Sequence, residues 1–434
     1  MGGAPKPRAP LPDDALDVHL FGRRIGTLRQ AADGARFTAA PEALDEYGIG
    51  SPVLSVALPL VATAASAPAT EAFFGGLLPE GPRLDALLRD RPGLSRRKLV
   101  GLLAAVGRDV AGAIVLPGPE VTALGPLLTA DEAAAEVANP STFVAGGGSV
   151  SAGLRPKVAL GRSAEGWHAA RDGHPSTHMI KPVSPDAIRD AHAEVWTMRL
   201  ARAAGLIGYD VWLESFGDIP AVVIERFDRE PVPGGIRRLH QEDAAQALAL
   251  PWGGDDKFSW GNPRATYVAI AGLLDRDRTV FDDGRGDKEL LLQHTVFRLI
   301  VGDTDAHAKN HALLHGADGT VDLAPMYDVT PGVLYGGGVG PALFVDGHRT
   351  LHTIDADAVV AEARSWGIAE PVAREVLAET AARVRDEARG LAADASIAEH
   401  LPGYVTQAAA ALLEGRPVGL GLGEFPTLRP LGVV

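Results

Sequence analysis

Residues 288–310 read KELLLQHTVFRLIVGDTDAHAKN, an apolar helical pattern that runs directly into a dense polar segment. Leu292, Val296 and Leu299 recur at helical spacing, so one face of the predicted helix is expected to be buried. Gly302 is a typical residue to end that helix. The following loop presents five chemically able side chains, namely Asp303, Asp305, His307, Lys309 and Asn310. This density of polar groups after a buried helix predicts a functional site.

The spacing of Asp305 and Asn310 fits phosphoryl transfer. A protein kinase needs a carboxylate that orients the substrate hydroxyl and an amide oxygen that holds magnesium, spaced D-x-x-x-x-N. Eighteen residues after Asn310, Asp328 ends the apolar run DLAPMYD, where a second magnesium ligand is needed. We therefore predict that Asp305 is the catalytic base and that Asn310 and Asp328 are metal ligands.

Two other interpretations of the loop remain open at this point. Single Asp, His and Asn residues in loops are most often solvated turn residues. Alternatively, Asp303, Asp305 and His307 form D-x-D-x-H, which would be half of a two-metal hydrolase site. The other histidines occur singly, without the spacing of metal ligands, which counts against a hydrolase.

The first half of the chain offers the nucleotide-binding parts of a kinase. Residues 146–153 include four glycines, and backbone N–H groups of such a loop can approach phosphates. Lys157 opens the next predicted strand. Lys181 ends the strand THMIK, and Glu194 on the following helix is its expected ion-pair partner. The apolar strand before residues 225–227 has the character of a hinge that offers backbone groups to adenine.

The hydrophobic pattern predicts a β-rich half followed by an α-rich half, which indicates two lobes with a cleft between them. Strands are expected in a hairpin at DVHLFGRRIGTLRQ and at LSVALPL, KVALGR, THMIKP, DVWLESFG and IPAVVIERF. One helix is expected to begin at Ser95 and end at Gly107, and a second to end at Gly205. From about residue 240 the pattern is mostly helical.

Composition limits the class of protein. The formal net charge of −14 argues against a surface that is basic throughout, as a nucleic-acid-binding protein would have. The absence of cysteine excludes disulfides and zinc–thiolate sites. Neither a membrane span nor a signal peptide is expected, so the predicted location is the cytoplasm, with no membrane partner.

With these motifs in order, the sequence resembles the HipA family of toxin kinases over about residues 17–415. The shared landmarks are LSVALPL, FFGGLLPEG, VGRDVAGAI, AGLRPKVAL, THMIKP, ERFDRE, LHQEDAAQALALP, GDTDAHAKN and MYDVTP. The resemblance implies an α+β, two-lobed, protein-kinase-like fold with a small β-rich N-terminal subdomain and a mostly helical C-terminal lobe. The expected divisions are a disordered tail at 1–16, the N-terminal subdomain at 17–116, the rest of the N-lobe at 117–239 and the C-lobe at 240–434.

The resemblance also implies ATP and Mg²⁺ as cofactors and assigns site residues. Asp305 is again the base, Asn310 and Asp328 hold metal, and Lys181 pairs with Glu194. The implied ATP-binding residues are Ala152, Gly153, Leu154, Arg155, Pro156, Lys157, Lys181, Glu225, Arg226, Phe227, His307, Ala308, Lys309, Asn310, Tyr327 and Asp328.

Members of the family autophosphorylate a serine in the Gly-rich loop. Here the matching position is Val150, so Ser149 and Ser151 are the candidates, unless the modification is missing. The resemblance further implies a HipB-like helix-turn-helix antitoxin, DNA contact only through that antitoxin, and a protein substrate, for which an aminoacyl-tRNA synthetase is one candidate.

We thus expect a serine/threonine kinase that acts as the toxin of a HipBA-like system, causing growth arrest and persistence. The main alternative is a catalytically weak kinase fold that acts as a co-repressor or scaffold with its antitoxin. A metal-dependent phosphohydrolase is the less favoured alternative.

Overall fold

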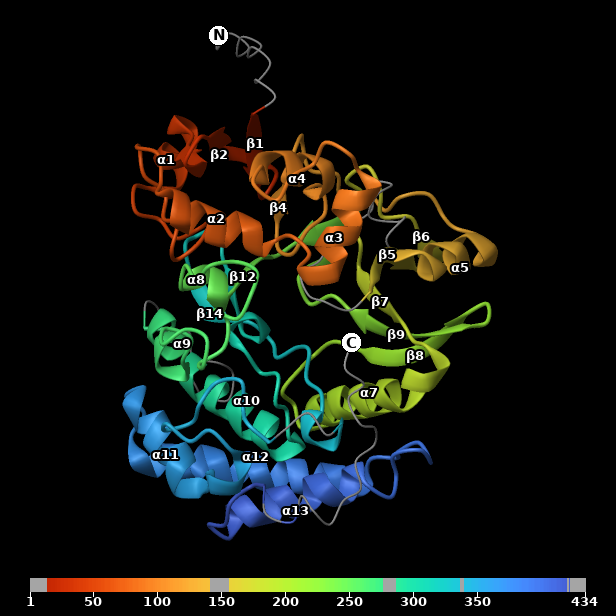
Figure 1. Cartoon of the computed structure of the whole chain (residues 1–434), viewed down its shortest axis with the longest axis vertical. Coiled ribbons are helices and arrows are strands. Elements are labelled where there is room, and N and C mark those ends of the chain that lie inside the picture. Colours follow the sequence, from red (N-terminus) through yellow and green to blue (C-terminus); the bar gives the residue numbers. More distant parts are fainter. Residues whose placement is uncertain (1–13, 141–155, 276–285, 336–338, 420, 422–434) are drawn as a thin grey trace.

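The computed structural model describes residues 14–140, 156–275, 286–335, 339–419 and 421. The β-rich N-terminal part lies at one end of the molecule and the long helices α12 and α13 lie at the other (Figure 1). The predicted order of a β-rich half and a helical half is therefore confirmed. No helix among the described residues is long and apolar enough to cross a membrane.

The N-terminal subdomain is an antiparallel sheet in the order β3-β2-β1-β4, with four helices packed around it. The predicted hairpin is present as β1 and β2. The buried side chains of Leu28, Phe37, Phe73 and Phe74 centre its core. The elements are β1 (Ala15–Leu20), β2 (Arg23–Ala31), β3 (Gly34–Ala39), β4 (Ile114–Val115), α1 (Pro41–Tyr47), α2 (Ala67–Gly76), α3 (Gly81–Asp90) and α4 (Leu99–Val106).

Two local predictions in this subdomain are wrong. LSVALPL is not a strand, although its leucines are buried. Its proline, Pro59, and its bends keep it out of the sheet, and Val56 N–H instead donates to Glu242 Oε1 over 2.8 Å. The helix predicted to begin at Ser95 is capped by Lys98, because residues 95–98 form a separate turn. Its predicted end at Gly107 is correct.

The middle of the chain forms a five-stranded antiparallel sheet in the order β6-β5-β7-β9-β8. Successive residues of a strand point to opposite faces. Accordingly Ala221 and Val223 pack with the N-terminal core, whereas Val222 packs with the C-lobe core. The sheet therefore joins two cores. The elements are α5 (Ala130–Ala138), β5 (Val158–Ser163), β6 (Gly166–His168), β7 (His178–Pro182), η1 (Pro185–Ala187), α7 (Ile188–Ala203), β8 (Val211–Phe216) and β9 (Ile219–Glu225).

The C-lobe combines small sheets with helices. The hairpin β10–β11 and the three-stranded sheet β12-β13-β14 lead into a bundle in which α10 packs on α12 and α13. Gly302 ends α10 with φ +70°, a conformation that favours glycine, so the predicted stop is correct. The strands are β10 (Arg229–Val232), β11 (Gly235–Arg238), β12 (His240–Asp243), β13 (Ala312–His315) and β14 (Val321–Leu323). The helices are α8 (Ala244–Ala247), α9 (Tyr267–Leu273), α10 (Asp287–Val301), η2 (Ala308–Asn310), η3 (Gly332–Tyr335), η4 (Leu351–Thr353), α11 (Ala356–Ser365), α12 (Glu370–Gly390) and α13 (Leu401–Leu413).

Candidate active site

Arg298 holds the polar loop that follows α10. Its buried guanidinium pairs with Asp303 and donates to the backbone oxygens of Asn310 and Tyr327 over 2.9 and 2.8 Å. One side chain thus fixes the start of the loop, its end, and the backbone next to Asp328. No sequence motif assigned Arg298 a role, although a charged side chain within the apolar run TVFRLIV indicates a buried arginine with an ionic partner.

Two hydrogen bonds within the loop hold the backbone of Asp305. Asp303 Oδ1 accepts from Asp305 N–H over 3.0 Å, and Asp305 O accepts from Asn310 Nδ2 over 2.7 Å. The Asp305 backbone is therefore fixed, while its side chain is 66% exposed. Because Asn310 Nδ2 makes this bond, its Oδ1 is the amide atom left to serve a cation. The geometry presents a carboxylate to an incoming molecule on a preorganised loop.

Three residues from three segments form the Lys181 cluster, which consists of Lys181, Glu194 and Asp328. Lys181 Nζ, at the end of β7, lies 2.7 Å from Glu194 Oε1 on α7 and 2.9 Å from Asp328 Oδ1. Lys181 lowers the pKa of Asp328 well below its usual range, against the effect of burial. Asp328 adopts φ +53° and its side chain remains 48% exposed. Asp328 is therefore ionised, and it is the carboxylate of the cluster that faces outward.

Lys157 extends this group of charges. Burial, together with the nearby positive charges of Arg83 and Lys181, lowers the pKa of Lys157 to about 7. Pro156 beside it is exposed. The other residues assigned to the phosphate loop, Ala152, Gly153, Leu154 and Arg155, lie outside the described residues, as do Ser149 and Ser151.

The hinge segment meets the Asp328 segment through aromatic rings. Phe227 packs against Tyr327 with ring centroids 5.7 Å apart. Tyr327 Oη in turn donates to Lys309 O over 2.6 Å. Glu225 Oε2 accepts from Asp210 N–H over 3.1 Å, which braces the end of β9. The structure therefore brings Phe227 against Tyr327, the residue before Asp328 of the Lys181 cluster.

The side chain of Arg226, which the sequence analysis assigned to ATP, lies elsewhere. It points into a buried group of charges, the Asp228 cluster, in which Arg226 Nε and Nη2 each donate to Asp228 over 2.8 Å. Arg226 Nη2 also donates to Val110 O over 3.0 Å. The side chain thus joins the hinge to the N-terminal subdomain. The cluster comprises Asp109, Arg226, Asp228, Arg229 and Arg238.

Lys309 also differs from its assigned place among the phosphate contacts. Its ammonium pairs with Glu80, from the turn before α3, and lies 3.9 Å from Asp243 Oδ2. Glu80 is bound on its other oxygen by Lys257 Nζ at 3.3 Å. A buried carboxylate of the N-terminal subdomain therefore holds the catalytic loop. Sequence spacing gives no signal for this pair.

His307 and Ala308 complete the loop. Burial and the nearby charge of Lys257 lower the pKa of His307 to about 3, so the ring is neutral. His307 Nε2 lies 4.0 Å from Asp305 Oδ1, and Phe258 meets the ring edge-on at 5.1 Å. Ala308 N–H donates to Lys257 O over 3.0 Å. His307 therefore borders the base, while Ala308 serves to attach a neighbouring segment.

The structure favours a magnesium site over a two-metal hydrolase site. Asp303 is occupied by Arg298, and the described ranges contain no group of three His, Cys, Asp or Glu residues that would hold a metal ion. Asp328 and Asn310 instead offer the oxygen atoms that Mg²⁺ prefers, and Mg²⁺ keeps several waters and substrate oxygens as further ligands. The donor set fits magnesium bound with a nucleotide.

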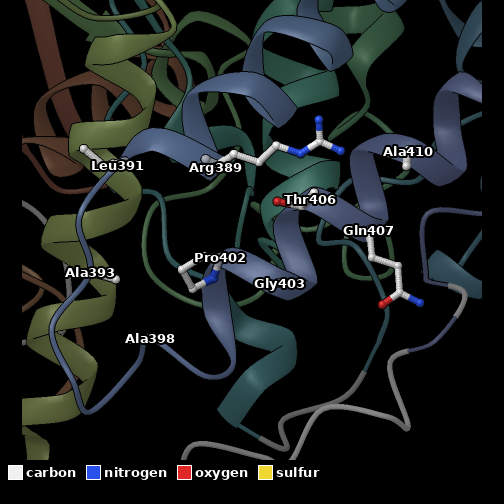
Figure 2. A pocket seen from close by; sticks show the side chains of 10 residues that line it. Arg389, Leu391, Ala393, Ala398, Pro402, Gly403, Thr406, Gln407 and Ala410 are labelled. Carbon is white, nitrogen blue, oxygen red and sulfur yellow. The ribbon is translucent and has the colours of Figure 1, made fainter.

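An open hollow of about 510 Å³ lies away from these residues, at the end of α12 and along α13 (Figure 2). Its walls are mostly small and apolar, from residues such as Leu391, Ala393 and Pro402. Among the described residues that line it, Arg389 is the only ionisable one, and none carries the carboxylate that phosphoryl transfer needs.

Comparison with known proteins assigns the family. Residues 149–388 match the HipA-like C-terminal domain, and residues 16–116 match the HipA N-terminal domain. The chain belongs to the HipA family. A putative kinase, Y4mE of Sinorhizobium fredii, is 31% identical to this HipA-family chain over 89% of it and 95% of the relative. The serine/threonine-protein kinase toxin HipA of Shewanella oneidensis is 30% identical over 74% of the chain and 76% of the relative.

A solved structure agrees with this family assignment. The complex of HipA, HipB and operator DNA from Shewanella oneidensis contains a chain that matches with a TM-score of 0.75 and 26% identity. The match covers 96% of the HipA-family chain described here and 100% of that chain. The two-lobed, kinase-like fold expected from the sequence is thereby confirmed.

Proposed function

We propose that this HipA-family protein is an ATP-dependent serine/threonine protein kinase that acts as the toxin of a HipBA-like pair. The Lys181 cluster carries the proposal. It joins a strand-end lysine, a helix glutamate and a C-lobe aspartate within 2.9 Å. This is the arrangement that protein kinases use to hold phosphates and metal. The exposed carboxylate of Asp305 supplies the base beside it.

Each side chain has a defined role in the proposed reaction. Lys181 binds the α- and β-phosphates of ATP, and Glu194 keeps its ammonium oriented. Asn310 and Asp328 hold magnesium, which neutralises the charge that develops on the phosphates. Asp305 orients the serine hydroxyl and accepts its proton as the oxygen attacks the γ-phosphorus. ADP leaves with the β–γ bridging oxygen.

The remaining assignments complete the nucleotide site. Residues 152–157 cover the phosphates, and the backbone of residues 225–227 binds adenine, with Phe227 and Tyr327 as the adjoining aromatic wall. His307 borders the γ-phosphate as a neutral ring. The arginine side chain at position 226 is excluded from this set. The cytoplasm is the proposed location of this kinase.

The proposal extends to partners because the Shewanella oneidensis relative was solved with HipB and operator DNA. A HipB-like antitoxin would bind this chain, and DNA would be reached only through that antitoxin. The phosphorylated substrate is a protein serine, and an aminoacyl-tRNA synthetase is one candidate target. Ser149 or Ser151 is the proposed autophosphorylation site, and growth arrest with persistence is the proposed outcome.

Labelled ATP tests the kinase activity. Wild-type protein with magnesium should label itself or proteins of a cell extract, and Asp305→Asn should reduce the rate about 10²- to 10⁴-fold, the usual contribution of a general base. Because the Asp305 side chain is largely exposed, the variant should unfold at the same temperature as the wild type. Absence of any wild-type labelling would favour the co-repressor alternative.

A further inference from the structure

An exposed tryptophan stands beside the catalytic loop. Trp260 is 59% exposed and stacks on Phe258 with ring centroids 4.9 Å apart and planes 16° from parallel. Phe258 meets His307 edge-on at 5.1 Å. His307 lies two residues after Asp305, with its Nε2 4.0 Å from the Asp305 carboxylate. A continuous row of rings therefore leads from the proposed base to the surface.

The segment that carries Trp260 is held at several points. Its Lys257 O accepts from Ala308 N–H in the catalytic loop over 3.0 Å. Ser259 N–H donates to Ala342 O over 3.0 Å, and Ser259 Oγ donates to Ala265 O over 2.6 Å. The exposure of Trp260 is thus fixed by the structure around it. A rigid aromatic surface loses little entropy when it binds a partner.

Two acidic residues, Asp255 and Asp256, belong to the same turn as Trp260. The backbone of Asp255 lies directly against Gly261, the next residue after Trp260. Asp256 accepts from Asn262 Nδ2 over 2.9 Å, which keeps it beside the same turn. The positive charge of Lys257 is engaged by Glu80. Lys257 Nζ lies 5.5 Å from the centroid of the Phe258 ring, the ring next to Trp260. The turn therefore combines an exposed aromatic ring with two carboxylates for which the described residues supply no ion pair.

We propose that Trp260, together with Asp255 and Asp256, binds an arginine of the protein substrate that lies close to the acceptor serine. The inference rests on the proposed kinase function. Arginine stacks on tryptophan faces more often than lysine does, and its planar guanidinium pairs with carboxylates at the same time. One Trp260 face is covered by Phe258, so the other takes the guanidinium.

Other exposed apolar residues provide the contrast. Ile49 is 77% exposed and Leu127 is 50% exposed. Both lie outside the segment that touches the catalytic loop, and neither offers an aromatic face. Ile49→Ala is therefore a matched control for removal of an exposed apolar side chain.

Serine peptides of one length, with arginine, lysine, leucine or glutamate placed in turn at each flanking position, test the proposal. Wild-type protein should phosphorylate the best arginine peptide with kcat/KM three- to tenfold above its leucine counterpart, and lysine should fall between them. Trp260→Ala should remove this preference, so that the arginine and leucine peptides react with equal kcat/KM. Trp260→Phe should retain part of it, and Asp255→Asn should weaken it. Ile49→Ala should behave as wild type.

The outcomes separate the inference from the function beneath it. A wild-type protein that phosphorylates no peptide, no extract protein and not itself contradicts the kinase proposal. Equal rates on arginine and leucine peptides, or a preference that survives in Trp260→Ala, overturn the Trp260 site alone. A concentration-dependent dimer that dissociates in Trp260→Ala would assign the surface to a second copy of the chain and overturn the proposal as well.

Discussion

The Asp228 cluster and the Lys181 cluster both pair carboxylates with cations, but they differ in how much of the carboxylate is left for a ligand. In the Asp228 cluster every side chain is at most 6% exposed, and Asp228 Oδ2 accepts from Gly112 N–H, Gln241 Nε2 and Arg226 Nη2, each over 2.8 Å. In the Lys181 cluster, Asp328 is 48% exposed, and among the described residues its carboxylate pairs with Lys181. The carboxylate of Asp228 is thus occupied by protein donors, whereas that of Asp328 leaves oxygen for a ligand.

The difference indicates how a charge cluster is recognised as a site. Burial alone would raise the pKa of Asp228, but Arg226 and Arg229 more than offset this and hold it well below its usual range. Asp328 has a similarly low pKa for the same electrostatic reason. A shifted pKa therefore does not distinguish the two clusters. What distinguishes them is that the Asp328 carboxylate keeps oxygen available to a ligand and belongs to the same proposed site as the base, Asp305.

The largest expected effect is a loss of folding stability when the Asp228 cluster is broken. Asp228→Asn leaves two buried guanidinium groups short of a counter-charge, and breaking a buried ion pair in this way costs about 3–5 kcal/mol. Urea unfolding should report that loss. Asp386→Asn, at an exposed pair with Arg385, is the matched control and should leave the stability nearly unchanged, because solvent screens such pairs. A small effect at Asp228 would mean that the cluster does not fasten the subdomains.

In the Lys181 cluster, the same aspartate-to-asparagine substitution should lower the kinase activity. Asp328→Asn should lower the rate of phosphoryl transfer about 10²- to 10³-fold, the size of effect seen when one electrostatic contact to a transition state is lost. Asparagine tolerates the positive φ at this position, so the unfolding free energy should stay within about 1 kcal/mol of wild type. Kinetics and urea unfolding of one preparation measure both. A stability loss equal to that of Asp228→Asn would remove the contrast between the clusters.

How much of this the sequence could predict depends on how local each feature is. The helix before Gly302 and the Asp305–Asn310 spacing are local patterns, and both are readable from the sequence. The Lys309–Glu80 pair spans 229 residues, so no spacing rule finds it. The strand context of Arg226 predicts only a backbone role at the hinge, whereas the direction of its side chain depends on Asp228 and on the distant backbone of Val110.

The contact between the subdomains should also respond to pH. His240 is 1% exposed; its Nε2 donates to Leu54 O over 2.8 Å and its Nδ1 accepts from Ala113 N–H over 3.4 Å. Burial, with the neighbouring His315, lowers the pKa of His240 to about 3. The unfolded chain then binds a proton below about pH 6.5 that the folded chain does not, so stability falls as pH falls.

Between pH 7 and pH 5 this single group should account for about 2 kcal/mol of lost stability. Urea unfolding of His240→Gln across that range should give a flatter pH dependence than wild type. His352→Gln, at an exposed histidine, should leave the dependence as it is. An unchanged slope in His240→Gln would show that other buried histidines set the acid sensitivity.

Glu80 shares features with both clusters, since it is buried like Asp228 but pairs with Lys309 of the catalytic loop. Glu80→Gln should lower kcat about tenfold while leaving the KM for ATP nearly unchanged, because the pair with Lys309 positions the loop and does not itself contact the nucleotide in this arrangement. That loss corresponds to about 1.4 kcal/mol of activation free energy. If Glu80 acts through Lys309, the double variant Glu80→Gln/Lys309→Met should be no slower than Lys309→Met alone. Additive losses would instead mean that Lys309 leaves Glu80 to bind phosphate during turnover, which would give Lys309 a role like that of the Lys181 cluster.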